Sequence, residues 1–249
     1  MLKEERFRFI LEKLKTHQKV LSAGLSQELR VSEDTIRRDL HELAQSGFIQ
    51  KVHGGALPRS PALLSYRERE DYALQNKQEI AKKAINLVKS RQVIILDGGT
   101  TTLQIARLLP EGLKATVFTN SIPIALHLAN HATIETVLAG GKLFKHSQVT
   151  LGIETIETFR AIRADVCFLG VCSIHYEIGL SVPNREEAQV KQAMASSAAQ
   201  VVALATAEKI GTAETYIVAP INEVDILITD TIITPDVIKL YTEKGMEVI

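Results

Sequence analysis

Two neighbouring arginines near the start of the chain could contact nucleic acid. Arg37 and Arg38 lie close to the hydroxyl of Thr35 and the imidazole of His41. Arginine donates hydrogen bonds to phosphate oxygens and, in bidentate geometry, to the edge of guanine. This set of side chains therefore favours DNA binding. The alternative is an ordinary surface helix with solvated charges, and the short pattern by itself leaves both interpretations open.

A second group of polar residues, Asp97 to Thr102, follows the apolar run Val93–Leu96. Its two glycines let the backbone approach an anion, the N–H groups of a following helix point towards it, and the threonine hydroxyls add donors. The loop therefore suits a phosphate, although it is neither a Walker motif nor a GxGxxG motif. A plain tight turn is the alternative interpretation.

Further polar residues occur later in the same half of the chain. Asn120 and Ser121 offer amide and hydroxyl partners for sugar hydroxyls, although Ser121 could simply cap its helix. Glu187 and Lys191 are four residues apart and could belong to a site or form a surface ion pair. Lys209 could contact an anion or be solvated. These residues are candidates for a binding site, each with a structural alternative.

A helix beginning near Ser32 must position the arginine pair. Ser32 is a favourable N-cap, and Val31 and Ile36 occupy the positions of a hydrophobic staple. Ile36, Leu40 and Leu43 recur at helical spacing, so one stripe of this helix is expected to face a core. The polar side chains are left on the flanks and on the far side of the helix.

The surrounding residues complete a small domain. Helical patterns at residues 3–15 and 20–29 precede this helix, and the alternating segment 48–53 follows it as a short strand. Three helices followed by a β wing form a winged helix-turn-helix. Lys51 and His53 on the wing could touch the DNA backbone or the minor groove, or could lie on a solvated strand edge.

The breaker-rich stretch Gly54–Pro61 marks the end of this domain. Beyond it, β-branched runs alternate with helical patterns, which indicates a mostly parallel α/β sheet covered on both faces. Ligands of such sheets bind beyond the carboxyl ends of the strands, where the polar residues of this half lie. The expected strands are residues 93–96, 115–119, 134–138, 166–171, 201–205, 216–219 and 224–228. The expected domains are residues 1–58 and 76–249, with a linker at 59–75.

Composition sets further limits. The 249 residues are 45% hydrophobic and carry a formal net charge of zero, so any DNA-binding surface must be local. Residues 1–58 hold ten basic and eight acidic side chains, a difference of +2. Cys167 and Cys172 fit neither a CxxC motif nor a zinc site and are expected to be buried thiols. No apolar run approaches the ~18 residues of a membrane span, and the charged N-terminus is unlike a signal peptide. We therefore expect a cytoplasmic protein without membrane, metal or cofactor.

Two segments of the first domain form a specific pattern: SEDTIRRDL at residues 32–40 and VHGGA at residues 52–56. In both, the chain resembles the DNA-binding domain of the DeoR family of bacterial transcriptional regulators. The resemblance implies a helix-turn-helix at about residues 20–39, a recognition helix at Ser32–Gln45, and binding of double-stranded operator DNA as a dimer or higher homo-oligomer. The residues expected to contact DNA are Ser32, Thr35, Arg37, Arg38, His41, Lys51 and His53.

Four segments of the second domain continue this pattern: LDGGTTT at 96–102, TNS at 119–121, LAGG at 138–141 and EAQVK at 187–191. They are similar to the sensor domain of DeoR-type regulators, which resembles ribose-5-phosphate isomerase in fold and binds a phosphorylated sugar. The resemblance implies effector contacts at Asp97, Gly98, Gly99, Thr100, Thr101, Asn120, Ser121, Gly140, Gly141, Glu187, Lys191 and Lys209. One position departs from the family: Thr206 stands where an aspartate usually precedes the lysine by three residues, which could change the sugar hydroxyls that are recognised.

Together these observations predict a DNA-binding transcriptional regulator, most often a repressor in this family, that controls a carbohydrate-metabolism operon in response to a phosphorylated sugar. One alternative is a sugar-phosphate isomerase-like enzyme with a DNA-binding appendage, in which Asp97, Glu187 and Lys209 would supply acid–base groups. Another is a protein-interaction module, against which the arginine pair argues. No Ser-His-Asp, metal or cofactor signature supports the enzyme, so we expect no catalytic residues.

Overall fold

The structure is a computed structural model that describes residues 2–17, 19–46, 48–58, 64–230 and 233–249. The chain divides into two compact units, Met1–Leu63 and Leu64–Ile249. Residues 64–75, predicted above as part of the linker, belong to the second unit, whereas residues 59–63 lie outside the described residues. Each unit has a hydrophobic core of its own.

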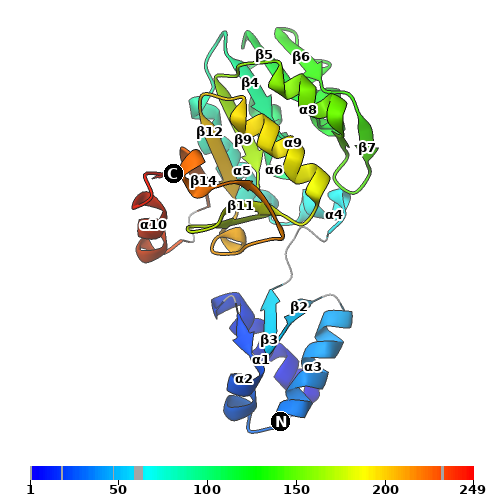
Figure 1. Ribbon diagram of the computed structural model, residues 1–249, viewed down its shortest axis with the longest axis vertical. Helices are drawn as coiled ribbons and strands as arrows, with labels where there is room; N and C mark the ends of the chain where they lie inside the picture. Colours follow the sequence, from blue (N-terminus) through cyan, green and yellow to red (C-terminus); the bar gives the residue numbers. More distant parts are fainter. Residues whose placement is uncertain (1, 18, 47, 59–63, 231–232) are drawn as a thin grey trace. The chain divides into compact units, whose positions relative to one another are not determined.

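The first unit is a winged helix-turn-helix, as the sequence predicts (Figure 1). Its helices are α1 (Lys3–His17), α2 (Ser22–Leu29) and α3 (Glu33–Gln45). Its antiparallel sheet has the strand order β1 (Val20–Leu21), β3 (Gly55–Pro58), β2 (Ile49–Val52). Ile36, Leu40 and Leu43 of α3 are buried in its core, so the polar side of α3 is free to face a partner.

One local prediction in this unit is wrong. Residues 20 and 21 form strand β1 and do not begin a helix; α2 starts at Ser22. Val20 pairs with Ala56, and Leu21 pairs with Gly55. A side chain at position 55 would lie 2.0 Å from the carbonyl oxygen of Val20, so only glycine permits this close approach. The partner strand, remote in sequence, therefore overrides the helical pattern of this segment.

The second unit contains, among its described residues, a seven-stranded sheet in the order β15-β14-β12-β9-β4-β5-β6. Every pairing in this sheet is parallel. Its strands are β4 (Val93–Leu96), β5 (Ala115–Thr119), β6 (Ile134–Leu138), β9 (Val166–Gly170), β12 (Val201–Ala205), β14 (Ile226–Thr229) and β15 (Glu247–Val248). Because the strands are parallel, all their carboxyl ends lie at one edge of the sheet, and that edge collects the predicted ligand residues.

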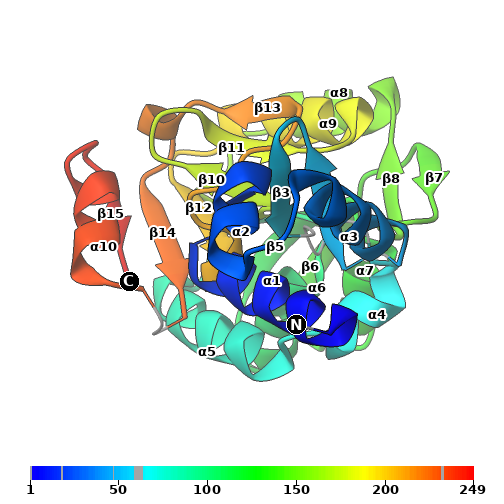
Figure 2. The ribbon, with the colours of Figure 1, turned by 90° about the horizontal axis from the view of Figure 1, so that it is seen from below.

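Helices cover both faces of this sheet, as Figure 2 shows for α5 and α6 on one side and α8 and α9 on the other. Alternate residues of β4 point to opposite faces of the sheet. Ile94 and Leu96 pack against the helix layer that contains α5 and α6, and Ile95 packs against the layer that contains α8 and α9. The first layer is α5 (Leu74–Ala84), α6 (Thr100–Leu108) and α7 (Ile122–Leu128), and the second includes α8 (Ile153–Arg160) and α9 (Arg185–Ser196). Helix α10 (Pro235–Thr242) follows β14 and contributes Tyr241 to the second core.

Two smaller antiparallel groups extend from the main sheet. One contains β10 (Ser173–His175), β11 (Gly179–Val182) and β13 (Tyr216–Ala219), and the other is the hairpin of β7 (Lys142–Phe144) and β8 (Val149–Leu151). The prediction that residues 216–219 join the parallel sheet is therefore wrong. The first two residues of β13 are exposed, which a central strand covered on both faces would not allow.

Candidate DNA-binding face and ligand site

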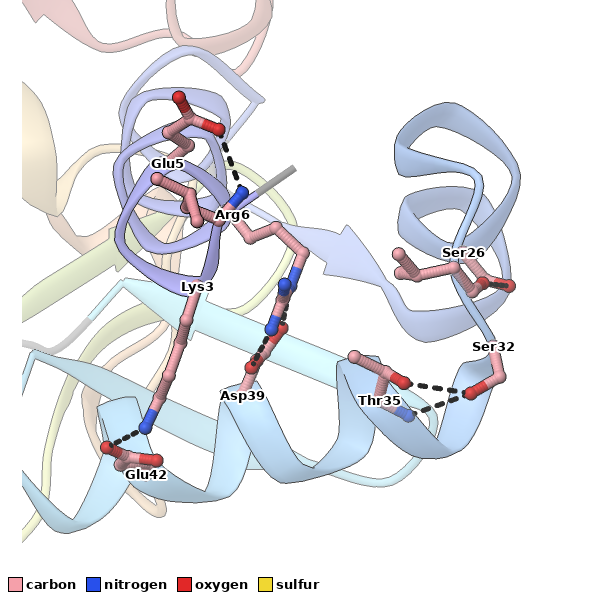
Figure 3. Close-up of polar contacts among 10 residues, drawn as sticks. Lys3, Glu5, Arg6, Ser26, Ser32, Thr35, Asp39 and Glu42 are labelled. Atoms are coloured by element: carbon pink, nitrogen blue, oxygen red, sulfur yellow. Dashed lines mark hydrogen bonds and ion pairs between the residues drawn. The ribbon is translucent and has the colours of Figure 1, made fainter.

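The start of α3 is fixed by its own first turn (Figure 3). The hydroxyl oxygen of Ser32 accepts a hydrogen bond from the backbone N–H of Thr35 at 3.2 Å, which makes Ser32 the N-cap of α3. The two hydroxyls also share a hydrogen bond of 2.9 Å. Two of the predicted DNA-contacting side chains are therefore engaged with each other and stabilise the helix start.

The arginine pair on α3 is exposed, but its two members differ. Arg37 lies 3.5 Å from Glu33 and 3.6 Å from Asp34, within its own helix. Arg38 and His41 are exposed and have neither a hydrogen bond nor an ion pair with any described residue. The guanidinium of Arg38 is thus available to an external acceptor without breaking an internal contact.

The wing lies next to the recognition helix. A groove of about 790 Å³ is lined by Asp34, Arg37, Arg38, His41, Glu42, Gln45 and Lys51. It brings Lys51 of β2 together with three of the predicted DNA-binding residues of α3. His53 is exposed beyond the end of β2 and does not line the groove, and neither do Ser32 and Thr35.

Sequence reasoning gave no role to Asp39, which lies in the middle of the recognition helix and is buried. Its carboxylate accepts from Nε of Arg6 at 2.6 Å and from Nη2 at 2.9 Å, a bidentate pair that joins α1 to α3 (Figure 3). The hydrogen bond with Asp39 raises the pKa of Arg6. The missed signal is spacing: Asp39 follows Ile36 by three residues, on the core-facing side, where a carboxylate requires a partner.

The candidate ligand site is centred on a buried ion pair at the carboxyl edge of the parallel sheet. Asp97, directly after β4, pairs with Lys191 of α9. Its Oδ2 also accepts from the N–H of Gly170 at 2.9 Å, and Lys191 donates to the carbonyl oxygen of Gly170 at 2.9 Å. Burial raises the pKa of Asp97. Burial lowers the pKa of Lys191, but Asp97 and Glu187 more than offset this, so its pKa lies above the ordinary value.

The loop after Asp97 is packed closely against neighbouring strand ends. A side chain at position 98 would lie 2.1 Å from Cγ1 of Val149. One at position 99 would meet the hydroxyl of Thr102 at 3.2 Å, and Gly170 lies beyond it. Thr100 and Thr101 are buried in the first turn of α6, whose N–H groups have no partners within the helix. The loop therefore presents backbone donors beside a lysine.

Asn120 and Ser121, at the end of β5, have different roles. Asn120 is 98% buried; its Nδ2 donates to the carbonyl oxygen of Thr150 at 2.9 Å, whereas its Oδ1 is buried without a hydrogen-bond partner among the described residues. Oδ1 faces Gly98, since a side chain there would lie 3.4 Å from it. The hydroxyl of Ser121 accepts from the N–H of Ile124 at 3.4 Å and caps α7.

Gly140 and Gly141 are exposed and contact residues outside the Asp97–Lys191 pair. The carbonyl oxygen of Gly140 accepts from Thr155 at 2.6 Å. Gly141 has φ +141°, and a side chain there would lie 2.5 Å from the carbonyl oxygen of Leu151. Gly141 lets the β7–β8 hairpin pack, whereas a side chain at position 140 would meet nothing within 4 Å. The contacts described for these two glycines do not join the other predicted ligand residues.

Glu187 and Lys209 are half-buried. The N–H of Glu187 donates to the capping side chain of Asn184 at 3.0 Å, and the side-chain charge of Glu187 contributes to the raised pKa of Lys191. Burial lowers the pKa of Lys209, and the nearby charges of Arg69 and Lys191 lower it further. The structure thus places Lys209 within electrostatic range of Lys191. The half-buried thiol of Cys172, expected to be fully buried, lies in the same region.

Thr206, at the position of the family's aspartate, is buried and donates to Glu208 at 2.6 Å. Asp230, at the end of neighbouring β14, is also buried, and its Oδ2 accepts from the N–H of Ala207 at 3.5 Å. A carboxylate on the adjacent strand therefore holds the short 3₁₀ helix Ala207–Lys209 that carries Lys209.

Comparison with known protein families agrees with both units. Residues 6–61 match the DeoR-like helix-turn-helix domain, and residues 73–231 match the DeoR C terminal sensor domain. The chain belongs to the DeoR family. The predicted family is therefore confirmed. As a member of this family, the chain is a DNA-binding transcriptional regulator and not an enzyme, and the isomerase-like alternative is not supported.

Relatives of this DeoR-family regulator match it over almost their whole length. The HTH-type transcriptional regulator GlpR of Haloferax volcanii is 34% identical over 100% of this chain and 98% of its own. The HTH-type transcriptional repressor GlcR of Bacillus subtilis is 34% identical over 100% and 96%. The HTH-type transcriptional regulator GolR of Listeria innocua is 34% identical over 98% and 97%.

Among solved structures, ribose 5-phosphate isomerase A of Methanocaldococcus jannaschii aligns with a TM-score of 0.39 and 19% identity over 54% of this chain and 53% of its own. The fold of the sensor domain of this DeoR-family regulator is defined by its own strand order, β15-β14-β12-β9-β4-β5-β6. Within the described ranges, no helix is long and apolar enough to span a bilayer, and no cluster of three or more His, Cys, Asp or Glu side chains could hold a metal ion.

Proposed function

We propose that this DeoR-family regulator represses a carbohydrate-metabolism operon, and that a phosphorylated sugar bound at the carboxyl edge of the parallel sheet changes its affinity for operator DNA. The relatives GlpR and GlcR support this proposal, since both are transcriptional regulators and GlcR is a repressor. The proposal of a sugar phosphate depends on the chemistry of the second unit.

The supporting observation is that one edge of the sheet combines cationic donors with a buried acceptor that has no hydrogen-bond partner in the part of the chain that the structure describes. Lys191, Lys209 and the first turn of α6 offer donors to a phosphoryl group. Oδ1 of Asn120 offers an acceptor to a sugar hydroxyl. Asp97 would repel a phosphoryl group, so we assign it to positioning Lys191 and the loop. A ligand carrying both an anion and hydroxyls would satisfy these groups together.

DNA binding and ligand binding would be coupled through the arrangement of a homo-oligomer, a dimer or a tetramer. A ligand that binds one arrangement more tightly shifts the population towards it. Two recognition helices must lie about one helical turn of DNA apart, or a multiple of it, so a small change in spacing removes several contacts at once.

A thermal-shift screen tests the ligand. Pentose and hexose phosphates are compared with the matching unphosphorylated sugars and with inorganic phosphate. We expect one phosphorylated sugar to raise the melting temperature more than either control, because a ligand that binds the native state stabilises it. That sugar should also change the affinity for DNA selected by the protein from a random pool. A full screen without any stabilising phosphorylated sugar would contradict the proposal.

Substitution of Arg38 tests the DNA-binding face. Because its guanidinium has no partner among the described residues, we expect Arg38→Ala to lose about 1–3 kcal/mol of binding to the selected DNA, roughly fivefold to 150-fold. Arg8→Ala is the matched control, since Arg8 is an exposed arginine of α1. Equal small losses in both variants, measured by fluorescence anisotropy at fixed salt, would show that only overall charge matters.

A further inference from the structure

The segment from α4 (Tyr66–Asp71) into α5 contacts the carboxyl edge of the sheet at two places. Arg69 of α4 donates from Nη2 to the hydroxyl of Ser147 at 3.3 Å, in the turn between β7 and β8. That turn is fixed beside the end of β5, since the N–H of Ile122 donates to the carbonyl oxygen of Gln148, in the same turn, at 3.0 Å. Farther along, Asn76 donates to Asp230 at the end of β14 at 2.6 Å.

One hydrogen-bond donor of the Arg69 guanidinium is not used by any described residue. Its Nε is buried and has no hydrogen-bond partner among the described residues. Its charge contributes to the lowered pKa of Lys209, after β12, and partly opposes the rise in pKa that burial causes at Cys172, after β9. Arg69 therefore lies within electrostatic range of the central strand ends while it hydrogen-bonds to the turn beside β5. A buried donor on a cation without an acceptor costs free energy that an anionic ligand would recover.

Three further cations lie in this region, and one of them, Lys209, is within electrostatic range of the other two, Lys191 and Lys77. Lys191 is paired with Asp97, whereas Lys209 has no ion pair among the described residues. Lys77 of α5 is buried and donates to two carbonyl oxygens at the end of α4. Burial, then the charges of Lys209 and Arg69, lower the pKa of Lys77 to about 8. The carboxylates of Asp97, Glu187, Glu208 and Glu70 also act on these cations, so the unused donor of Arg69, and not an excess of positive charge, is the feature that favours an additional anion.

We propose that Arg69 is a further contact to the phosphoryl group of the effector, and that α4 thereby couples occupancy of the site to the connection with the DNA-binding unit. This inference rests on the proposed function, because it requires a phosphorylated ligand at this edge. Its motivation is independent of the family pattern: a buried, unpartnered arginine donor beside the strand ends that carry Lys209 and the unpartnered oxygen of Asn120. Helix α4 is the first helix of the second unit, so a ligand bound to Arg69 holds the element nearest the linker.

Titration calorimetry with the phosphorylated sugar that stabilises the wild type tests the assignment. We expect Arg69→Gln to weaken binding at least about tenfold, the loss of a charged hydrogen bond, while DNA affinity without ligand stays within about twofold. Arg69→Lys keeps the charge but loses the planar guanidinium, so its ligand affinity should lie between those of the wild type and Arg69→Gln. Arg67→Gln is the matched control, because it removes an exposed arginine from the same helix. Unchanged affinity in Arg69→Gln would overturn the assignment.

A wild-type measurement covers the case in which Arg69→Gln fails to fold. Hydrogen exchange of the amides in α4 should slow when the ligand binds, because the ligand ties this helix to the sheet edge. Exchange that does not change in α4 would overturn the role of this helix. Failure of the wild type to bind any phosphorylated sugar or inorganic phosphate would overturn both proposals, whereas normal binding by Arg69→Gln would overturn only this one.

Discussion

Each unit of this regulator buries one aspartate against one cation, and the two pairs serve different purposes. Asp39 and Arg6 join two helices behind the DNA-binding face, and neither points into the groove that lines that face. Asp97 and Lys191 lie within the proposed ligand site itself. The first pair therefore lies behind the proposed DNA-binding face and positions it, whereas the second is part of the proposed ligand site.

The surroundings of the pairs differ in the same way. Around α3 the predicted contact residues are exposed or half-exposed, so water or a neighbouring side chain can satisfy their polar atoms when DNA is not bound. In the second unit, Oδ1 of Asn120 and Nε of Arg69 are buried and lack partners among the described residues. An exposed surface can bind a rigid polyanion although its polar groups already have hydrogen-bond partners without it. A small ligand is enclosed by buried polar groups, some of which lack a hydrogen-bond partner until the ligand binds.

The largest expected effect comes from breaking the positioning pair. Asp39→Ala leaves the guanidinium of Arg6, whose side chain is only 12% exposed, without its bidentate partner. We expect the first unit to lose about 3 kcal/mol of stability, because breaking a largely buried, bidentate ion pair by removing one partner is costly. DNA affinity should fall with it, since α3 loses its buried ion pair with α1. Denaturant unfolding of the full chain, monitored by hydrogen exchange in α1 and α3, measures the loss.

Glu42→Ala provides the control for Asp39→Ala. Glu42 pairs with Lys3 at 2.5 Å between the same two helices, but both side chains are about half exposed, at 49% and 51%. Water screens this pair, so its loss should cost less than about 1 kcal/mol. Similar losses in the two variants would mean that burial does not distinguish the pairs.

The next effect concerns the pair within the ligand site. Lys191→Met removes the partner of Asp97, whose pKa is already raised by burial, so we expect about 3 kcal/mol of lost stability near neutral pH. The deficit should shrink as the pH falls through the raised pKa of Asp97, because the protonated carboxyl needs no cation. Adding Asp97→Asn should recover part of the stability in a double-mutant cycle. A deficit that is independent of pH would contradict this explanation.

Local patterns predicted the fold well where one face of an element is buried. The spacing of Ile36, Leu40 and Leu43 located α3, and the run Val93–Leu96 located β4. The strand at Val20 was missed because its partner lies more than thirty residues away and competes with a helical pattern. Pairing between distant segments cannot be inferred from the periodicity of either one.

The sites show the same limit. Strand-end polar residues such as Asp97 and Asn120 were identified as candidates because parallel strands end at one edge. Lys191, on α9, was identified by its spacing from Glu187 and by the family resemblance, and the fold brings it to Asp97. Asp39 was missed although its spacing placed it on the core-facing side. Arg69 was missed because it belongs to a segment that composition alone assigns to the linker, and only the folded chain brings it to Ser147.

A smaller effect is expected from Lys77, whose pKa is lowered from 10.5 to about 8 chiefly by burial. Below pH 8 the buried ammonium of Lys77 is charged in the folded chain, which bears the full free-energy cost of its desolvation. As the pH rises, the unfolded chain keeps its proton longer, so stability should increase with pH in this range. Between pH 8 and about 9.5 the second unit should gain about 2 kcal/mol relative to Lys77→Met. Denaturant titrations at several pH values, kept below the titration of tyrosines in the unfolded chain, measure this difference.

The smallest effect separates helix capping from DNA contact at Ser32. Its hydroxyl is already engaged with the N–H and hydroxyl of Thr35, so we assign it to the helix start. Ser32→Ala should cost about 1 kcal/mol of stability, whereas Ser32→Gly should cost only a few tenths, because glycine is tolerated at an N-cap.

Ser32→Gly therefore removes the hydroxyl while nearly preserving the fold, and its DNA affinity shows which role matters. If Ser32 only caps α3, anisotropy titrations should give an affinity within about twofold of wild type, and Arg38→Ala should remain far weaker. If Ser32→Gly instead loses tenfold, its hydroxyl contacts DNA directly. The capping bond and the phosphate contact would then share one side chain, and the DNA-binding face would extend from the groove to the first turn of α3.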